Sequence, residues 1–472
     1  MYYNKQAIKA TVGRGLVTVK DFSAGINGNK DEENLSLGEC AFSYNFNMQG
    51  GTLKDGNGVK KSNFGNSPVF SEAGVKPERL YFYKRYNKDA KAYDEYLLIY
   101  ASDKEIYAAK STEEQFKKVN GLYFYTPPYA CSYNYMGDDV MIFSSDEKMK
   151  VYDGTTVTTV ENVPSVTSMC IHSERLFATE GGTKTSLWFS DDFNPLNWKV
   201  SLDEAGFIDI REGVGSLLKA VSFKDYVYVF ANYGIVRVSA YGDQTEFSVD
   251  GIAASSGKIC ADSIAVCGDR VIYLAEDGFY SFSGSSPQRI MRKIDGKIAG
   301  VDNSDAKGYY FNGNYYCKLK MQSDCGVRDV LIKYDIHRGA FAVSSELDIN
   351  DFVVADGEKA CELLFLINGK AQPAMLSDRA ENFSVPLDKH WLSGKTDLGT
   401  TETKRVTRLS LRTLTEIYVT VKSERGSRLL HFFGSNERQS RAVGLKGDLF
   451  TVSIDCRTPG ATISALRIEY EY

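Results

Sequence analysis

Short stretches rich in β-branched and aromatic residues, separated by polar turns, run through most of the chain. From Glu78 the sequence reads RLYFYKRY, EYLLIYAS and EIYAAK, with polar residues between these strand-length pieces. Such residues suit pleated, half-buried surfaces, and the intervening Asn, Asp and Lys residues favour turns. Long amphipathic helices are absent, and the best helical candidate, STEEQFKKV from Ser111, is short. The pattern predicts a meander of antiparallel strands.

One phrase of this pattern returns four times. A charged residue opens an apolar, aromatic strand at Asp139, Glu174, Asp225 and Asp269, at intervals of 35, 51 and 44 residues. A loose period of about 40 to 45 residues is typical of four-stranded propeller blades. Candidate units begin at about residues 78, 121, 166, 217, 258, 305 and 350. We therefore predict an all-β fold whose centre is a β-propeller of about six or seven blades over residues 66–385.

The two ends of the chain differ from these units. Residues 1–65 hold DFSAGIN and the glycine-punctuated NFNMQGGTLKDGNGVKK, which predict an extended N-terminal arm. After about Trp391, KRVTRLSLRTL, EIYVTVKSE and ALRIEYEY show longer alternation without the blade phrase. We expect residues 386–472 to form a C-terminal β-sandwich-like module that is able to pair with the arm.

Composition narrows the function classes. The net charge of −5 and the pI near 5.7 describe an acidic protein, without the global basic excess of a conventional nucleic-acid-binding protein. The first residues lack the apolar core of a signal peptide, and no run approaches the ~18 apolar residues of a membrane span. We expect synthesis in a cytoplasm and no membrane span. The nine cysteines form no CxxC pair and their number is odd, so we interpret them as reduced packing residues.

Motifs that carry enzyme chemistry are missing. The four histidines, His172, His337, His390 and His431, are scattered, and no HExxH, GxSxG or phosphate-loop spacing occurs. Adjacent acidic pairs at Asp138–Asp139 and Asp191–Asp192 point to opposite faces of a strand, so neither pair alone forms a glycosidase site. We predict no enzyme activity, no catalytic residue, no cofactor and no metal site.

A basic cluster is the remaining candidate for a contact surface. If KRVTRLSLRTL is a regular strand, Lys404, Arg408 and Arg412 share one face with Ser410, while Leu409 and Leu411 face the other way. These cations could contact a nucleic-acid backbone or an acidic neighbouring subunit. The alternative is a solvated outer face without a partner.

Four phrases together resemble a known family. They are the N-terminal stretch with GIN, Asn45 and GTLKDGNG, then LWFSDDFNPLNW at 187–198, GVGSLLKAVSFKDYVYVFANYGIVRVSAYG at 213–242 and GKICADSIAVCGDRVIYLAEDGFYSFSG at 257–284. In this order they resemble the propeller-bearing tail nozzle proteins of short-tailed bacteriophages, also called packaged-DNA stabilization proteins. The resemblance covers residues from about 20 to 380.

The resemblance implies a structural virion protein of the tail or neck, made in the bacterial cytoplasm. It implies a homohexameric ring below the portal and adaptor proteins, with tail fibres or spikes outside. The ring would retain packaged double-stranded DNA until genome ejection and let it pass without sequence-specific contact. An acidic chain fits such a conduit, since few phosphate contacts would hold the sliding DNA.

Two other interpretations stay open. A glycan-binding propeller, lectin-like or glycosidase-like, would recognise a host cell surface, with exposed Trp188 and Trp198 stacking on sugar faces. The other interpretation is a regulatory or scaffolding propeller of cellular origin, which would neither belong to a virion nor bind glycans.

Overall fold

The computed structural model describes residues 13–145, 148–181, 185–201, 204–211, 213–254 and 257–472. The first twelve residues of the predicted arm lie outside this range. The chain divides into two compact units. The propeller unit comprises residues 59–341 and 345–377, and the sandwich unit comprises residues 1–58, 342–344 and 378–472.

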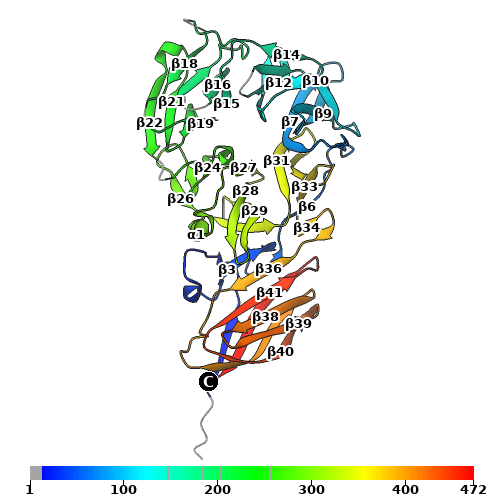
Figure 1. The fold of residues 1–472 in the computed structure, drawn as a ribbon, viewed down its shortest axis with the longest axis vertical. Helices are drawn as coiled ribbons and strands as arrows, with labels where there is room; N and C mark the ends of the chain where they lie inside the picture. The colour runs from blue at the N-terminus through cyan, green and yellow to red at the C-terminus, as the bar shows by residue number, and fades with distance from the viewer. Residues whose placement is uncertain (1–12, 146–147, 182–184, 202–203, 212, 255–256) are drawn as a thin grey trace, which may run out of the picture. The chain divides into compact units, whose positions relative to one another are not determined.

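Seven blades form the propeller; six are four-stranded sheets, and the seventh is part of a six-stranded sheet (Figure 1). Six of them are built from consecutive strands, which are β7 (Pro77–Asn87), β8 (Ala92–Ala101), β9 (Glu105–Lys110) and β10 (Lys117–Tyr123); β11 (Tyr129–Tyr135), β12 (Asp138–Ser144), β13 (Met149–Tyr152) and β14 (Val157–Val160); β15 (Val166–His172), β16 (Arg175–Glu180), β17 (Ser186–Phe189) and β18 (Gly206–Asp209); β19 (Leu217–Phe223), β20 (Tyr226–Ala231), β21 (Gly234–Ser239) and β22 (Ser248–Ala254); β23 (Ala265–Cys267), β24 (Arg270–Ala275), β25 (Gly278–Phe282) and β26 (Gln288–Ile290); β27 (Lys307–Phe311), β28 (Asn314–Ser323), β29 (Gly326–Asp335) and β30 (Ala340–Ser345). The only α-helix among the described residues is α1 (Asp295–Ile298). The predicted all-β propeller is confirmed, with seven blades.

The repeated phrase occupies the second strand of its blade. It forms β12, β16, β20 and β24, which lie between the first and third strands of their sheets. In β16 and β20 nearly every residue is buried, on both faces of the strand. A strand covered on both faces is a continuous apolar run, which explains why the phrase stands out from the alternating strands around it.

The seventh blade is closed by a strand from the other end of the chain. It contains β31 (Ile349–Asp356), β32 (Cys361–Ile367) and β33 (Ala374–Ser377), and its fourth strand is β6 (Gly58–Lys61). Beyond β6, the backbone N–H of Ser62 donates to the Pro373 carbonyl (3.2 Å) and that of Phe70 to the Ala371 carbonyl (2.9 Å). No pattern in the sequence indicates this pairing, because it joins residues more than 300 positions apart.

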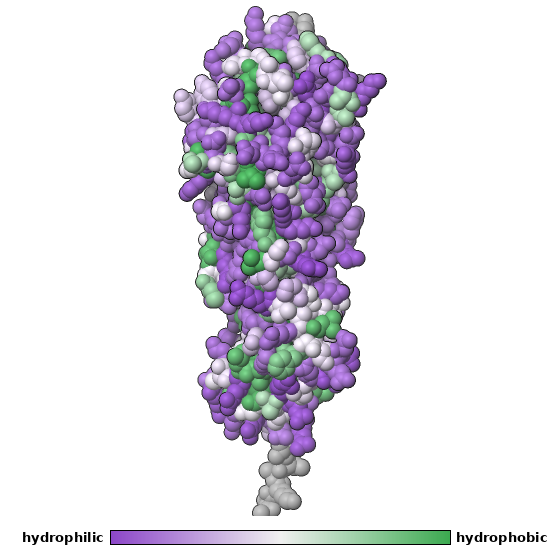
Figure 2. All heavy atoms as spheres, turned by 90° about the vertical axis from the view of Figure 1, so that its right-hand side faces the viewer, coloured by the Kyte–Doolittle hydropathy of each residue, from purple (hydrophilic) through white to green (hydrophobic). Residues whose placement is uncertain are grey.

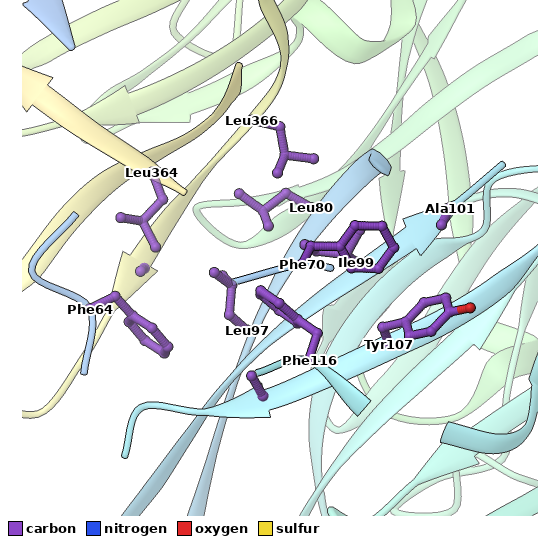
Figure 3. Packing of buried hydrophobic residues seen from close by; sticks show 12 residues of the cluster. Phe64, Phe70, Leu80, Leu97, Ile99, Ala101, Tyr107, Phe116, Leu364 and Leu366 are labelled. Carbon is purple, nitrogen blue, oxygen red and sulfur yellow. The ribbon is translucent and has the colours of Figure 1, made fainter. Parts of the chain in front are cut away.

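A hydrophobic cluster stabilises this closure (Figure 3). Phe64 and Phe70, which follow β6, pack with Leu97 of the first blade and Leu364 and Leu366 of the last. All five side chains are at most 7% exposed. Burying a large apolar side chain contributes about 1.5–3 kcal/mol, so the cluster holds the first and last blades together.

The sandwich unit contains two β-sheets. One has the order β4 (Phe46–Asn47), β5 (Leu53–Asp55), β42 (Thr462–Glu471), β37 (Lys404–Thr413) and β40 (Ser435–Gly447), with β1 (Arg14–Val19) also paired to β42. The other has the order β2 (Gly25–Ile26), β3 (Glu39–Tyr44), β36 (Lys389–Ser393), β41 (Phe450–Cys456), β38 (Ile417–Ser423) and β39 (Gly426–Phe432). A short hairpin, β34 (Glu381–Asn382) and β35 (Val385–Pro386), precedes β36. The predicted sandwich-like module is confirmed.

The segment that the sequence suggested as an arm supplies strands to both sheets. β1 pairs with β42 from Arg14 opposite Glu471 to Val19 opposite Leu466, and β3 pairs with β36. Between the sheets, Phe22 meets the fully buried Trp391 edge to face, with ring centroids 5.3 Å apart. Chain segments from both ends of the sequence therefore share one core.

Candidate functional site

The three predicted basic residues do not share one face. Arg408 and Arg412 are exposed, whereas Lys404 is 1% exposed. The Lys404 ammonium donates to the carbonyls of Asp397 (2.6 Å), Thr400 (2.6 Å) and Asp448 (2.9 Å), which uses all three of its donors. The placement of Lys404 on the contact face is therefore wrong, and its role is structural.

A β-bulge explains the difference. The pairing of β37 shifts between Val406 and Arg408 on both sides. Relative to β42, Thr407 is an extra residue in β37, whereas on the other side the extra residue lies in β40. A bulge of this kind interrupts the period of two. It places Arg405 on the same outer face as Arg408, and it turns Lys404 toward the buried side with Val406.

Five arginines gather on the outer face of this sheet, which we call the arginine face. The members are Arg405, Arg408 and Arg412 of β37, Arg438 of β40 and Arg467 of β42. Two of their nitrogens, Arg438 Nη1 and Arg467 Nε, are buried without a hydrogen-bond partner among the described residues. Burial and the charges of Arg467 and Arg412 lower the pKa of Arg438. Glu469 and Glu471 lie opposite Arg408 and Arg405 in the sheet, so the repulsion between like charges is concentrated at Arg412, Arg438 and Arg467.

Charge also differs between the two units. The sandwich unit has 21 Lys and Arg against 18 Asp and Glu, a net charge of +3, whereas the propeller unit has 35 against 43, a net charge of −8. The chain as a whole is acidic, but the sandwich unit carries a net positive charge. A polyanion would therefore bind the sandwich unit in preference to the propeller unit.

An exposed apolar patch lies at the edge of the second sandwich sheet. Strand β39 is the last strand of its sheet, and Leu429 on it is 66% exposed. Phe433 is 59% exposed and contacts His431, which stacks on Tyr418 with ring centroids 4.8 Å apart. Figure 2 shows hydrophobic side chains, in green, gathered over the sandwich. We call these four residues the edge patch; exposed apolar groups on the last strand of a sheet favour contact with another chain.

The second candidate site is a cavity on the propeller axis, with a volume of about 420 Å³. Its walls come from the first strand of every blade, β7, β11, β15, β19, β23, β27 and β31, and from the segments around them. Four of these strands open with the same shift in pairing, and the residue after the shift is Arg79, Ser168, Lys219 or Asp351. The first three line the cavity, and Asp351 binds a lining lysine. Bulges re-aim side chains, and here they are associated with polar groups at the axis.

Ion pairs cross this axial pocket. Arg79 of the first blade binds Asp262, which precedes the fifth blade (2.8 Å), and Lys307 of the sixth binds Asp351 of the seventh (2.6 Å). Asp351 also accepts the backbone N–H of Leu80 (2.7 Å). These contacts tie blades that are far apart in sequence.

Lys219 is the third cation of the pocket. Its ammonium donates to the Ile264 carbonyl (2.8 Å), and no carboxylate binds it among the described residues. Burial lowers the pKa of Lys219. Burial opposes the ionisation of Asp262, but Arg79, Lys219 and Lys307 around it hold its pKa below the ordinary value. Three cations against two carboxylates leave the pocket with one excess positive charge.

Sequence reasoning missed the axial pocket because each blade contributes one or two residues to it. The available signal was a charged residue inside an otherwise apolar first strand, as in LLKAV around Lys219. The two tryptophans of the glycan-binding alternative are placed differently from expectation. Trp198 is 2% exposed and donates to the Pro195 carbonyl (2.9 Å), so it cannot stack on a sugar. Trp188 is half-buried, donates to Glu180 (2.9 Å) and packs on Phe207.

All nine cysteines are free thiols. Cys325 and Cys361 are exposed, so the packing interpretation is wrong for these two. Among the described residues, no group of three or more His, Cys, Asp and Glu residues is arranged to hold a metal ion. No helix in the described part of the chain is long and apolar enough to cross a membrane.

Comparisons with known proteins give little beyond architecture. No family model matches the chain, and no curated protein matches it. Among solved structures, BBS1N in complex with ARL6DN is similar at 10% identity and a TM-score of 0.42, covering 71% of this chain and 99% of that one. The computationally designed Ika8 protein is similar at 11% identity and a TM-score of 0.40, covering 66% of this chain and 99% of that one.

Proposed function

We propose that the chain is a structural subunit of a bacteriophage tail, a nozzle protein that forms a ring below the portal and retains packaged DNA. The observation that carries the proposal is the order of the four family-like phrases over residues 20–380. In this role the propeller is a rigid building block, and portal, adaptor and tail fibre or spike proteins are the expected neighbours.

The arginine face supports a contact with DNA. Its side chains lie on a sheet surface, and Arg405, Arg408 and Arg412 are exposed along one strand. Arginines on an open surface contact phosphates without reading base edges, so such binding would be salt-dependent and indifferent to sequence. The acidic propeller would add few contacts of this kind with phosphates. DNA would therefore be held weakly and at one place.

The edge patch supports assembly with a second copy of the chain. Leu429 and Phe433 lie on or beside β39, which is the last strand of its sheet, and both side chains are exposed. Repeated contacts of this kind around a closed rotation build a ring. We expect the purified chain to form a closed oligomer, a hexamer by the family resemblance.

Native mass spectrometry and electron microscopy of the purified protein test this function. We expect one ring species for the unaltered chain and monomers for Leu429→Glu, because a buried unpaired charge at the contact is costly. Leu37→Glu is the matched control, since Leu37 is 45% exposed and lies outside the edge patch. Monomers of the unaltered chain at all concentrations would overturn the proposal.

A further inference from the structure

We propose that the axial pocket of the propeller binds a small monocarboxylate, with the Lys219 ammonium holding the carboxylate group. This inference stands independently of the tail function. It begins from a cation that the fold brings to the axis and leaves without a carboxylate among the described residues. An ammonium has three donors, and the Ile264 carbonyl uses one of them.

The charge of the pocket selects the ligand. Asp262 is engaged by Arg79 and Asp351 by Lys307, so Lys219 is the source of the single excess positive charge. One carboxylate makes the pocket neutral. A dianion such as phosphate would carry its second charge toward two aspartates, and a cation would meet three positive groups. The preference is therefore for a ligand with one negative charge.

The walls and the volume define the rest of the ligand. Tyr129 lies under the Arg79 guanidinium, 5.5 Å from ring centroid to Cζ, and Tyr309 lies 5.3 Å from Lys307 Nζ. Each ring holds its neighbouring cation in place. The two tyrosines also line the cavity, together with Tyr310. Phenol rings offer apolar surface and hydroxyl groups together. A volume of about 420 Å³ leaves room for a hydroxylated molecule as large as a hexuronic acid.

The pocket is also built to keep its shape. Ser168 accepts the backbone N–H of Ala220 in the next blade (2.9 Å), which fixes the strand that carries Lys219. Asp351 fixes the first blade in the same way through Leu80. A site whose walls are bonded across blades loses little freedom when a ligand enters, which favours binding.

Isothermal titration calorimetry with glucuronate tests the inference, with glucose and inorganic phosphate as the comparison ligands. We expect glucuronate to bind, glucose and phosphate to bind at least about tenfold more weakly, and Lys219→Met to weaken glucuronate binding about tenfold or more, as expected for a charge-assisted hydrogen bond. Lys199→Met, an exposed lysine of the same unit, is the control and should leave binding unchanged.

A second measurement uses the unaltered protein, in case Lys219→Met does not fold. Reductive methylation followed by peptide mass spectrometry should show Lys219 protected by glucuronate and unprotected by glucose. Absence of glucuronate binding at millimolar concentration, equal binding of glucose, tighter binding of phosphate, or unchanged labelling of Lys219 would each overturn the inference.

Discussion

Replacing Arg438 with methionine should stabilise the sandwich unit while weakening the contact with DNA that we propose for it. Met keeps the unbranched stem that covers the sheet and removes the guanidinium. That guanidinium has a buried Nη1 without a partner and lies among the like charges of Arg412 and Arg467. The arginine is therefore a cost to folding that a polyanion would offset.

The expected gain in the free energy of unfolding follows from the unpaired Nη1 donor of Arg438 and from the repulsion between its charge and those of Arg412 and Arg467. A buried donor without a partner costs about 1–3 kcal/mol, and exposed charge pairs are worth about 0.2–1 kcal/mol. We take about 1 kcal/mol as the net gain for Arg438→Met, because part of the guanidinium remains hydrated. For a unit of 156 residues, this gain raises Tm by roughly 2–4 °C.

Differential scanning calorimetry at low and high salt checks this prediction. The gain should shrink at high salt, where repulsion between surface charges is screened within about 3 Å at 1 M. Arg457→Met is the control, because Arg457 is paired with Asp388 (3.5 Å) and its loss should not raise Tm. In parallel, the slope of log K against log salt for double-stranded DNA should fall by about 0.9 for Arg438→Met. A lower Tm for Arg438→Met, or an equal rise for the control, would refute the reasoning.

Three further outcomes are expected. Arg79→Met should lower the free energy of unfolding by about 1–3 kcal/mol in urea titrations, since it leaves the largely buried carboxylate of Asp262 without its hydrogen-bonded partner; an unchanged midpoint would contradict this. Burial lowers the pKa of His172, so the folded state disfavours its protonated form. The contribution of His172 to the free energy of unfolding should be full above the unfolded pKa of about 6.5 and should decline as pH falls below it. Urea midpoints measured from pH 7.5 to 5 should therefore fall less steeply for His172→Gln than for the unaltered chain. Maleimide should label Cys325 and Cys361 in the native protein, and the five buried thiols, Cys40, Cys260, Cys267, Cys317 and Cys456, only after unfolding; mass spectrometry showing native label at any of these five would count against the described burial.

The sequence predicted the propeller because its strongest signal is local. A strand buried on both faces, such as β20 from Tyr226, must be apolar throughout, and four of seven blades mark it with an opening charge. The seven candidate units correspond to the seven blades. The pairing of the closing strand β6 could not be predicted from the sequence, since nothing in Val59 or its neighbours indicates a partner strand near residue 375.

The candidate sites were less accessible to sequence reasoning. Strict alternation put Lys404 with Arg408, and the bulge at Thr407, an extra residue relative to β42, reversed that placement. The arginine face depends on Arg438 and Arg467, which are paired to β37 only by the fold. The axial pocket combines single residues from separate blades, so its chemistry is invisible in any one stretch.

Immunogold electron microscopy of tailed particles tests the central claim most directly. Particles produced from the genome that encodes this chain would be purified, labelled with antibodies against the sandwich unit and imaged. The proposed function predicts label at the neck or tail of intact particles, at one position per particle. Particles without label, with the chain recovered only from the soluble lysate, would contradict it.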